Sequence, residues 1–160
     1  MTGYRFNTAP ELRVGLGTAR EVGAYCAQLG IKRPLLVTDP GLVAVGLVEP
    51  IREAIAATCE QVSLFSEVTA DPAESVVLDA LAALRAGEAD GVVGLGGGSS
   101  MDVAKAIAVL AAGNQTLAEA YGVDQVAGGR LPLILVDDLR QPDVACHLFW
   151  FLPLRALDPR

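Results

Sequence analysis

The feature that most constrains the fold is the junction at residues 92–105, where an apolar run ends at three consecutive glycines and a helical pattern follows. The glycines are Gly96, Gly97 and Gly98. Because glycine has no Cβ, the backbone can turn sharply there and a ligand can approach it closely. The first turn of the following helix offers amides without helical partners and the positive end of the helix dipole. The junction therefore predicts a parallel strand that passes into a helix and leaves room for a phosphate group.

Two polar residues predict where this helix begins. Ser99 follows the glycines and Asp102 lies three residues further on, which is the spacing of a capping box. We therefore expect Ser99 to be the N-cap and Asp102 to fix the loop. The segment is neither a Walker A loop nor the G-x-G-x-x-G fingerprint. A turn of this kind also occurs as a plain strand-to-helix corner, so its chemistry depends on other residues.

Along the rest of the chain, short apolar runs alternate with segments in which apolar residues recur three and four positions apart. The runs predict strands at 4–8, 12–16, 34–39, 61–65, 91–95 and 133–136. The helical segments run from Gly17 to Gly30 and over 48–58, 73–86 and 99–112. This order predicts an α/β domain with a Rossmann-like parallel sheet and helices on both faces. We expect the strand at 61–65 to be central, and Pro40 with Gly41 to break the chain.

An acidic residue closes one of the predicted strands. Asp39 follows a buried run, and ligands of parallel sheets bind at the carboxyl ends of strands, where the glycines also lie. A carboxylate there can accept both hydroxyls of an adenosine ribose and repels a 2′-phosphate, which favours NAD over NADP. The alternative is that Asp39 caps the turn that follows it.

The glycine junction also carries a family resemblance. The string is Gly96-Gly97-Gly98-Ser99-x-x-Asp102-x-Ala104-Lys105. It resembles the signature of iron-containing alcohol dehydrogenases, within the wider group of glycerol dehydrogenase and dehydroquinate synthase. The resemblance covers residues 4 to about 136 and implies that this loop binds the cofactor pyrophosphate. The predicted cofactor-binding set is Asp39, Gly96, Gly97, Gly98, Ser99 and Asp102. Residues 68–72 lie where the family has a loop near the nicotinamide. We interpret Asp71 as a helix-start residue, and the alternative is a small role in cofactor binding.

The resemblance stops after residue 136. There the family continues with Pro-Thr-Thr and a segment rich in glycine and serine, whereas this chain has Asp137 and Asp138. The codons GAC-GAC encode Thr-Thr when read one base later. We therefore divide the chain into a dinucleotide-binding domain, 1–136, and a divergent tail, 137–160, and hypothesise that the tail comes from a shifted reading frame. The alternative is a native short tail that packs as a terminal strand or helix.

The resemblance implies a metal that this sequence does not provide for. In the family, iron or zinc is held in a helical C-terminal domain by one aspartate and several histidines. His147 is the only histidine here, and its neighbour Cys146 would point away from it in regular structure. We therefore expect the C-terminal domain and the ligands for Fe²⁺ or Zn²⁺ to be missing from a truncated chain, and we assign no metal ligand and no catalytic residue.

Composition narrows the class of partner and the compartment. A net charge of −7 argues against a nucleic-acid partner and against an anionic membrane surface. The three cysteines, Cys26, Cys59 and Cys146, form no metal-binding or redox motif, and a buried thiol is the ordinary interpretation of the first two. The sequence shows neither a bilayer-length apolar stretch nor a signal peptide, so we expect a cytoplasmic protein.

The function implied by the resemblance is hydride transfer between NAD(H) and a small alcohol or aldehyde, assisted by a divalent metal. We expect this chain alone to supply the dinucleotide half and to show little or no turnover. The alternatives are a non-catalytic nucleotide-binding module, an inert remnant, or a lyase or sugar-phosphate dehydrogenase on the same fold. Members of the family are often homodimers, and residues 4–16 would provide a strand for such a contact.

Overall fold

The computed structural model describes residues 11–120, 125–137 and 149–151. Its centre is a six-stranded sheet in the order β1-β6-β5-β4-β2-β3. The strands are β1 (Glu11–Arg13), β2 (Pro34–Val37), β3 (Ser63–Phe65), β4 (Gly91–Leu95), β5 (Leu133–Val136) and β6 (Phe149–Phe151). The four strands β3, β2, β4 and β5 are parallel, whereas β6 pairs antiparallel with both β5 and β1.

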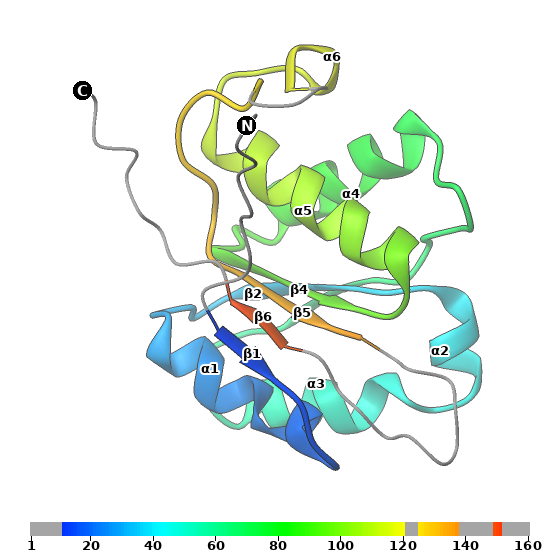
Figure 1. Ribbon diagram of the computed structural model, residues 1–160, viewed down its shortest axis with the longest axis vertical. Helices are drawn as coiled ribbons and strands as arrows, with labels where there is room; N and C mark the ends of the chain where they lie inside the picture. Colours follow the sequence, from blue (N-terminus) through cyan, green and yellow to red (C-terminus); the bar gives the residue numbers. More distant parts are fainter. Residues whose placement is uncertain (1–10, 121–124, 138–148, 152–160) are drawn as a thin grey trace, which may run out of the picture.

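Helices cover both faces of this sheet (Figure 1). On one face lie α1 (Val22–Gln28) and α3 (Val48–Ala56), and on the other lie α4 (Glu74–Ala86) and α5 (Gly98–Ala112). Three shorter elements complete the described chain, namely η1 (Thr18–Glu21), α2 (Pro40–Ala44) and α6 (Leu117–Ala120). The prediction of a parallel sheet between two helical layers is therefore confirmed.

The central strands are apolar because both of their faces are buried. Along β2, the side chain of Leu36 packs into the core beneath α1 and α3, while Leu35 and Val37 pack into the core beneath α4 and α5. All five residues of β4 and all four of β5 are buried. Two continuous cores, one on each side of the sheet, therefore hold the carboxyl ends of the strands in place.

Several local predictions need correction. The strand β3 lies at the edge of the sheet and not in its middle. Pro40 does not break the chain but begins α2, because Asp39 caps that helix and proline is tolerated in its first turn. The strand expected at 12–16 ends at Arg13, since Gly17 has a positive φ of 76° and turns the chain into η1. The strand expected at 4–8 lies outside the described residues.

Other predictions hold at the level of single residues. Gly30 ends α1 with a positive φ of 71°, and the amide of Ile31 donates to the carbonyl of Cys26 at 2.8 Å. This pattern is the Schellman ending that a glycine favours. The strand at 91–95 and the strand at 133–136 have the predicted bounds.

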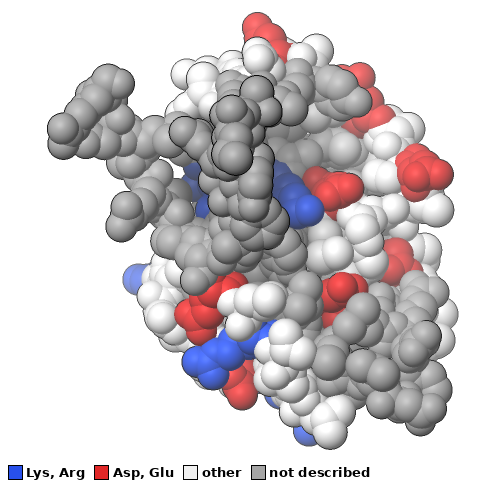
Figure 2. Space-filling view, viewed as in Figure 1, with Lys and Arg blue, Asp and Glu red and all other residues white. Residues whose placement is uncertain are grey.

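The surface of the described chain carries charges of both signs. Figure 2 shows carboxylates spread over the face that it views, with basic side chains gathered in separate small groups between them. The helices of the described residues are all too short or too polar to cross a bilayer.

Candidate functional site

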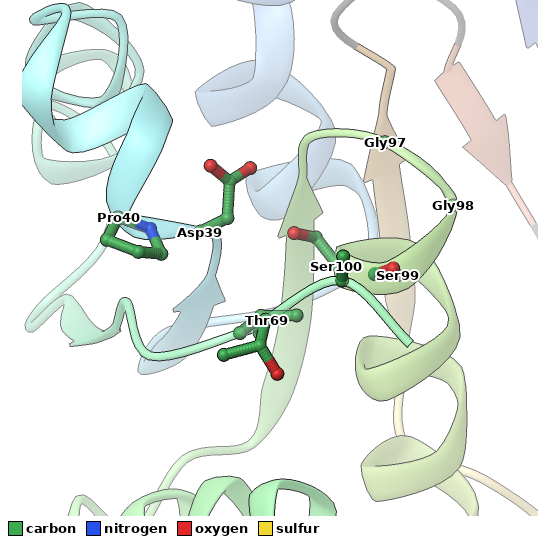
Figure 3. Close-up of a pocket in the computed structure, with 9 residues that line it drawn as sticks. Asp39, Pro40, Thr69, Gly97, Gly98, Ser99 and Ser100 are labelled. Carbon is green, nitrogen blue, oxygen red and sulfur yellow. The ribbon is translucent and has the colours of Figure 1, made fainter. Parts of the chain in front are cut away.

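A cleft of about 380 Å³ opens at the carboxyl ends of β2 and β4, beside the start of α5 (Figure 3). Three segments surround it: the end of β2 with the start of α2, the loop after β3, and the glycine turn after β4. The lining residues are Asp39, Pro40, Val68, Thr69, Ala70, Gly97, Gly98, Ser99 and Ser100. The structure thus brings most of the predicted site residues to one cleft.

The N-terminus of α5 forms one wall of the cleft. Gly97 is the N-cap, and the amide of Met101 donates the first helical hydrogen bond to its carbonyl at 3.1 Å. The amides of Gly98, Ser99 and Ser100 precede that bond and form the open end of the helix. Because amides and the helix dipole attract negative charge, this wall suits a phosphate group.

The capping box expected for this helix is wrong. The helix begins at Gly98, so Ser99 lies inside its first turn and is not its N-cap. The carboxylate of Asp102 instead accepts from Nζ of Lys105 at 3.0 Å, and its side chain is 72% exposed. The physical reason is that Gly97 adopts an extended conformation with φ −76° and ψ −169°, which starts the helix earlier than a serine cap would. A cofactor-binding role for Asp102 stays a prediction.

Gly96 connects β4 to the cleft wall, and its backbone conformation and close neighbours leave little room for a side chain. Its φ is +133°, and a Cβ atom there would lie 3.0 Å from Oγ of Ser100 and 3.1 Å from Oδ2 of Asp39. Its amide donates to the carbonyl of Val136 at 3.0 Å, which extends the pairing of β4 with β5. In contrast, a Cβ atom on Gly97 or Gly98 would meet no heavy atom of the described chain within 4 Å, so these two backbones border open space.

Asp39 has two structural relationships at the mouth of the cleft. Its Oδ1 accepts from the amide of Leu42 at 3.1 Å and caps α2, which is the alternative that the sequence left open. Its carboxylate also lies close to Gly96, since a Cβ atom there would be 3.1 Å from Oδ2 of Asp39. Figure 3 shows this carboxylate beside the glycine turn that follows β4. One side chain therefore both starts α2 and places a negative charge at the cleft.

The loop after β3 lines the cleft, although none of its residues belongs to the predicted cofactor-binding set. The amide of Val68 donates to the carbonyl of Thr38 at 3.3 Å, which ties this loop to the end of β2. Thr69 and Ala70 then lie on the cleft surface. The available signal was the position of 66–70 directly after a parallel strand. The helix-start interpretation of Asp71 is wrong, because Ala73 is the N-cap of α4 and Asp71 sits in a turn with φ +48°.

Metal ligands do not gather around this cleft. Within residues 11–120, 125–137 and 149–151, no three His, Cys, Asp or Glu side chains lie close enough together to hold a metal ion. Cys146 and His147 lie outside the described residues. The described part of the chain therefore does not fit Fe²⁺ or Zn²⁺.

The fold and the cleft together define a Rossmann-like α/β domain with a glycine turn and a helix N-terminus at the ligand edge of its sheet. Comparison with known families agrees with this class. Residues 9–137 match the model of the family described as iron-containing alcohol dehydrogenase, which is most of the chain. The chain belongs to the iron-containing alcohol dehydrogenase family.

The relatives are longer dehydrogenases and reductases. The chain is 33% identical over 131 residues to the NAD-dependent methanol dehydrogenase of Bacillus methanolicus, covering 82% of this chain and 34% of that protein. It is 41% identical over 100 residues to the 4-hydroxybutyrate dehydrogenase of Cupriavidus necator, covering 62% of this chain and 26% of that protein. The chain thus spans about a third or less of the curated relatives that it matches.

The fold also matches solved structures. The sulfoacetaldehyde reductase of Bifidobacterium kashiwanohense, solved in complex with NAD⁺, superposes with a TM-score of 0.70 at 25% identity, covering 83% of this chain and 36% of that one. The alcohol dehydrogenase of Oenococcus oeni has a TM-score of 0.74 at 17% identity, covering 91% of this chain and 42% of that one, a likeness of fold alone.

Proposed function

We propose that the cleft beside α5 binds NAD, and that this chain provides the cofactor-binding part of an oxidoreductase acting on a small alcohol or aldehyde. The observation that carries the proposal is the meeting of Asp39, the open N-terminus of α5 and the unobstructed glycine backbone in one cleft. Two named relatives, a methanol dehydrogenase described as NAD-dependent and a reductase solved with NAD⁺, support the choice of cofactor.

The glycine turn fits a pyrophosphate. The open faces of Gly97 and Gly98 permit close approach, and the amides of Gly98, Ser99 and Ser100 provide donors for phosphate oxygens. Gly96 holds the turn in a conformation that a larger residue cannot adopt without strain. These residues would therefore bind and orient the cofactor without taking part in bond making.

Asp39 would hold the adenosine ribose. Its carboxylate lies at the end of β2, where an acidic side chain of such a parallel sheet accepts hydrogen bonds from the ribose hydroxyls. Its negative charge disfavours a 2′-phosphate. NAD is thus the expected cofactor and NADP the weaker ligand. When bound, the nicotinamide accepts or donates a hydride, and the cleft serves to position it.

The proposal assigns no metal to the described residues, because no three of their His, Cys, Asp or Glu side chains lie close enough together to hold a metal ion. We therefore propose binding without efficient turnover for this chain. The purified chain, supplied with NAD, Fe²⁺ or Zn²⁺ and short primary alcohols, should produce no NADH above the rate without protein. Clear NADH production would refute this part of the proposal.

Calorimetric titration with NAD⁺ and with NADP⁺ tests the binding itself. We expect saturable binding of NAD⁺ and weaker binding of NADP⁺. For the variant Asp39→Asn, Asp79→Asn is the matched control. It also removes one negative charge, but from an exposed position on α4 that does not line the cleft. Binding without turnover is the result expected both for the proposed cofactor-binding part and for a non-catalytic nucleotide-binding module, whereas a folded chain that binds neither cofactor would contradict the proposal and support an inert remnant.

A further inference from the structure

Two cysteines that lie far apart in the sequence share one core. Cys26 lies on α1 and is completely buried, with 0% of its surface exposed. Cys59 follows α3, is only partly buried, and packs against the same cluster of side chains that contains Cys26. The sequence predicts a buried thiol at each of the two positions, and the fold brings the two cysteines to the same core.

The two cysteines are held together through the backbone of Ile31. The amide of Ile31 donates to the carbonyl of Cys26 at 2.8 Å, and the carbonyl of Ile31 accepts from Sγ of Cys59 at 3.5 Å. One turn earlier on α1, the carbonyl of Gly23 accepts from Oγ1 of Thr58 at 2.8 Å. The end of α1 is thus tied to the segment after α3 on both sides of the cysteine pair.

We propose that Cys26 and Cys59 form a reversible disulfide between α1 and the end of α3, with Cys59 as the thiol that reacts first and a small disulfide such as oxidised glutathione as the oxidant. A disulfide requires two cysteines on neighbouring elements with their side chains directed toward each other. The shared core and the two contacts through Ile31 place the cysteines on neighbouring elements, and the disulfide requires their side chains to turn toward each other.

The order of reaction follows from accessibility and acidity. Burial raises the pKa of the Cys26 thiol above its usual value, and the interaction with the neighbouring Cys59 thiol raises that pKa further. Because the thiolate is the reacting form, Cys26 does not attack an external disulfide first. Cys59 is partly exposed and can be reached from solvent.

The steps balance as two thiol–disulfide exchanges. The thiolate of Cys59 attacks one sulfur of oxidised glutathione, which forms a mixed disulfide and releases one glutathione thiolate. The thiol of Cys26 then loses its proton and attacks Sγ of Cys59, which forms the internal disulfide and releases the second glutathione thiolate. The two protein thiols are oxidised, one glutathione disulfide is reduced to two thiols, and the two protons pass to the leaving groups.

The disulfide would affect stability more than cofactor binding. It would join positions 26 and 59 and so close a loop that contains β2, α2 and α3. The residues that line the cleft come from other segments than α1 and α3. We therefore expect a rise in Tm of roughly 5 to 10 °C from restriction of the unfolded chain, with an unchanged thermal shift on addition of NAD⁺.

The test uses the full chain, reduced and then incubated with oxidised glutathione, quenched at intervals with an alkylating agent and digested with trypsin. The basic residues place the three cysteines on separate peptides, 21–32, 53–85 and 141–155. We expect a glutathione adduct on 53–85 at early times and a linked pair of 21–32 with 53–85 later. The same reaction in urea should lose this preference and link all three peptides. A persistent adduct on 53–85 with 21–32 still alkylated, or a predominant link to 141–155, would overturn the proposal.

Two variants separate the roles of the thiols. Cys59→Ser should leave Cys26 reduced after the same incubation, because the reactive thiol is absent. Cys26→Ala should stop at the mixed disulfide on 53–85, because no second thiol displaces the glutathione. A glutathione adduct on Cys26 of Cys59→Ser that forms as fast as the adduct on 53–85 of the unmodified protein, or a predominant link of 53–85 to 141–155 in Cys26→Ala, would refute the assignment. The peptide map of the unmodified protein decides the question if Cys26→Ala does not fold.

Discussion

A Cβ atom on Gly96 would lie 3.1 Å from Oδ2 of Asp39, so the turn after β4 and the acid after β2 meet directly. The register of the sheet explains this contact. Val37 pairs with Gly94 in the parallel ladder between β2 and β4, and each of the two site residues stands two positions beyond its member of that pair. A slip of one residue in the pairing of β2 with β4 would turn every side chain of a strand to the opposite face of the sheet. The packing of the buried side chains on β2 and β4 therefore fixes the register, and this register brings Asp39 next to Gly96.

Gly96→Ala should destabilise the fold. Its φ of +133° is strained for any residue with a Cβ, and the added methyl group would press on Ser100 and Asp39. We expect a loss of about 1 to 3 kcal/mol in the free energy of unfolding, measured by urea denaturation. A stability within a few tenths of a kcal/mol of the original would show that the turn relaxes to accept a side chain.

Gly98→Ala is the matched substitution without strain. A Cβ atom at this position meets no heavy atom of the described residues within 4 Å, and the residue is the first of α5. We expect stability to be unchanged or raised by up to about 1 kcal/mol, because alanine restricts the unfolded chain. Affinity for NAD⁺ should fall by about tenfold, or roughly 1.4 kcal/mol, because the methyl group enters the space assigned to the pyrophosphate. Undiminished affinity in calorimetry would argue against that assignment.

The fold was predictable from sequence where burial alone decides the structure. The strands β4 and β5 have apolar runs buried on both faces, so their bounds follow from composition. The edge position of β3 was not predictable in this way, because strand order depends on packing between distant segments. Leu64 is 42% exposed, a fact that the apolar run at 61–65 conceals.

The site was predictable in part for a similar reason. Asp39 and the glycines directly follow buried strands, so the rule for parallel sheets places them at one edge. The position of 66–70 after a parallel strand places Thr69 and Ala70 near the same edge, but their place on the cleft surface depends on the hydrogen bond between Val68 and Thr38, a tertiary contact that the sequence does not indicate. The false N-cap at Ser99 shows that the extended backbone of Gly97 prevails over a favourable serine.

Two substitutions separate the two roles of Asp39. Asp39→Asn keeps an oxygen that can accept from the amide of Leu42, so the cap of α2 and the stability should survive. The loss of charge should weaken NAD⁺ binding by about fivefold to tenfold, since hydrogen bonds to a charged group exceed neutral ones by about 1 kcal/mol. Binding of NADP⁺ should become stronger relative to NAD⁺. Calorimetry that finds no change in either affinity would place the ribose elsewhere.

Asp39→Ala should add a loss of stability to the loss of binding. Removing the cap of a helix costs about 1 kcal/mol, and the alanine offers no acceptor to the amide of Leu42. The difference between the alanine and asparagine variants in urea denaturation therefore measures the cap, while their shared effect on NAD⁺ affinity measures the carboxylate. Equal stability of the two variants would show that Asp39 does not support α2.

The hypothesis of a shifted reading frame predicts the DNA after codon 136. The match to the iron-containing alcohol dehydrogenase family ends at residue 137, next to the two aspartates that interrupt the family pattern. We expect one of the other two frames to read Thr-Thr and then a segment rich in glycine and serine, followed further on by histidines in a helical pattern. Sequencing of the genomic DNA tests this, and the absence of such a continuation in either frame would favour a native tail.

Gly23→Ala should be among the most damaging single substitutions on α1. A Cβ atom on Gly23 would lie 2.1 Å from the carbonyl oxygen of Ala54 and 3.0 Å from Oγ1 of Thr58, so the backbones of α1 and α3 would have to separate. Alanine favours a helix over glycine by up to about 1 kcal/mol, but overpacking against a backbone costs about 1 to 3 kcal/mol or more. We therefore expect a net loss of stability in urea denaturation, together with slower formation of the Cys26–Cys59 link.

Ala24→Ser is the control on the exposed face of the same helix, where a change of about 0.5 kcal/mol in the free energy of unfolding is expected. If Gly23→Ala were as stable as the original chain, the close contact of α1 with α3 would not be a requirement of the fold.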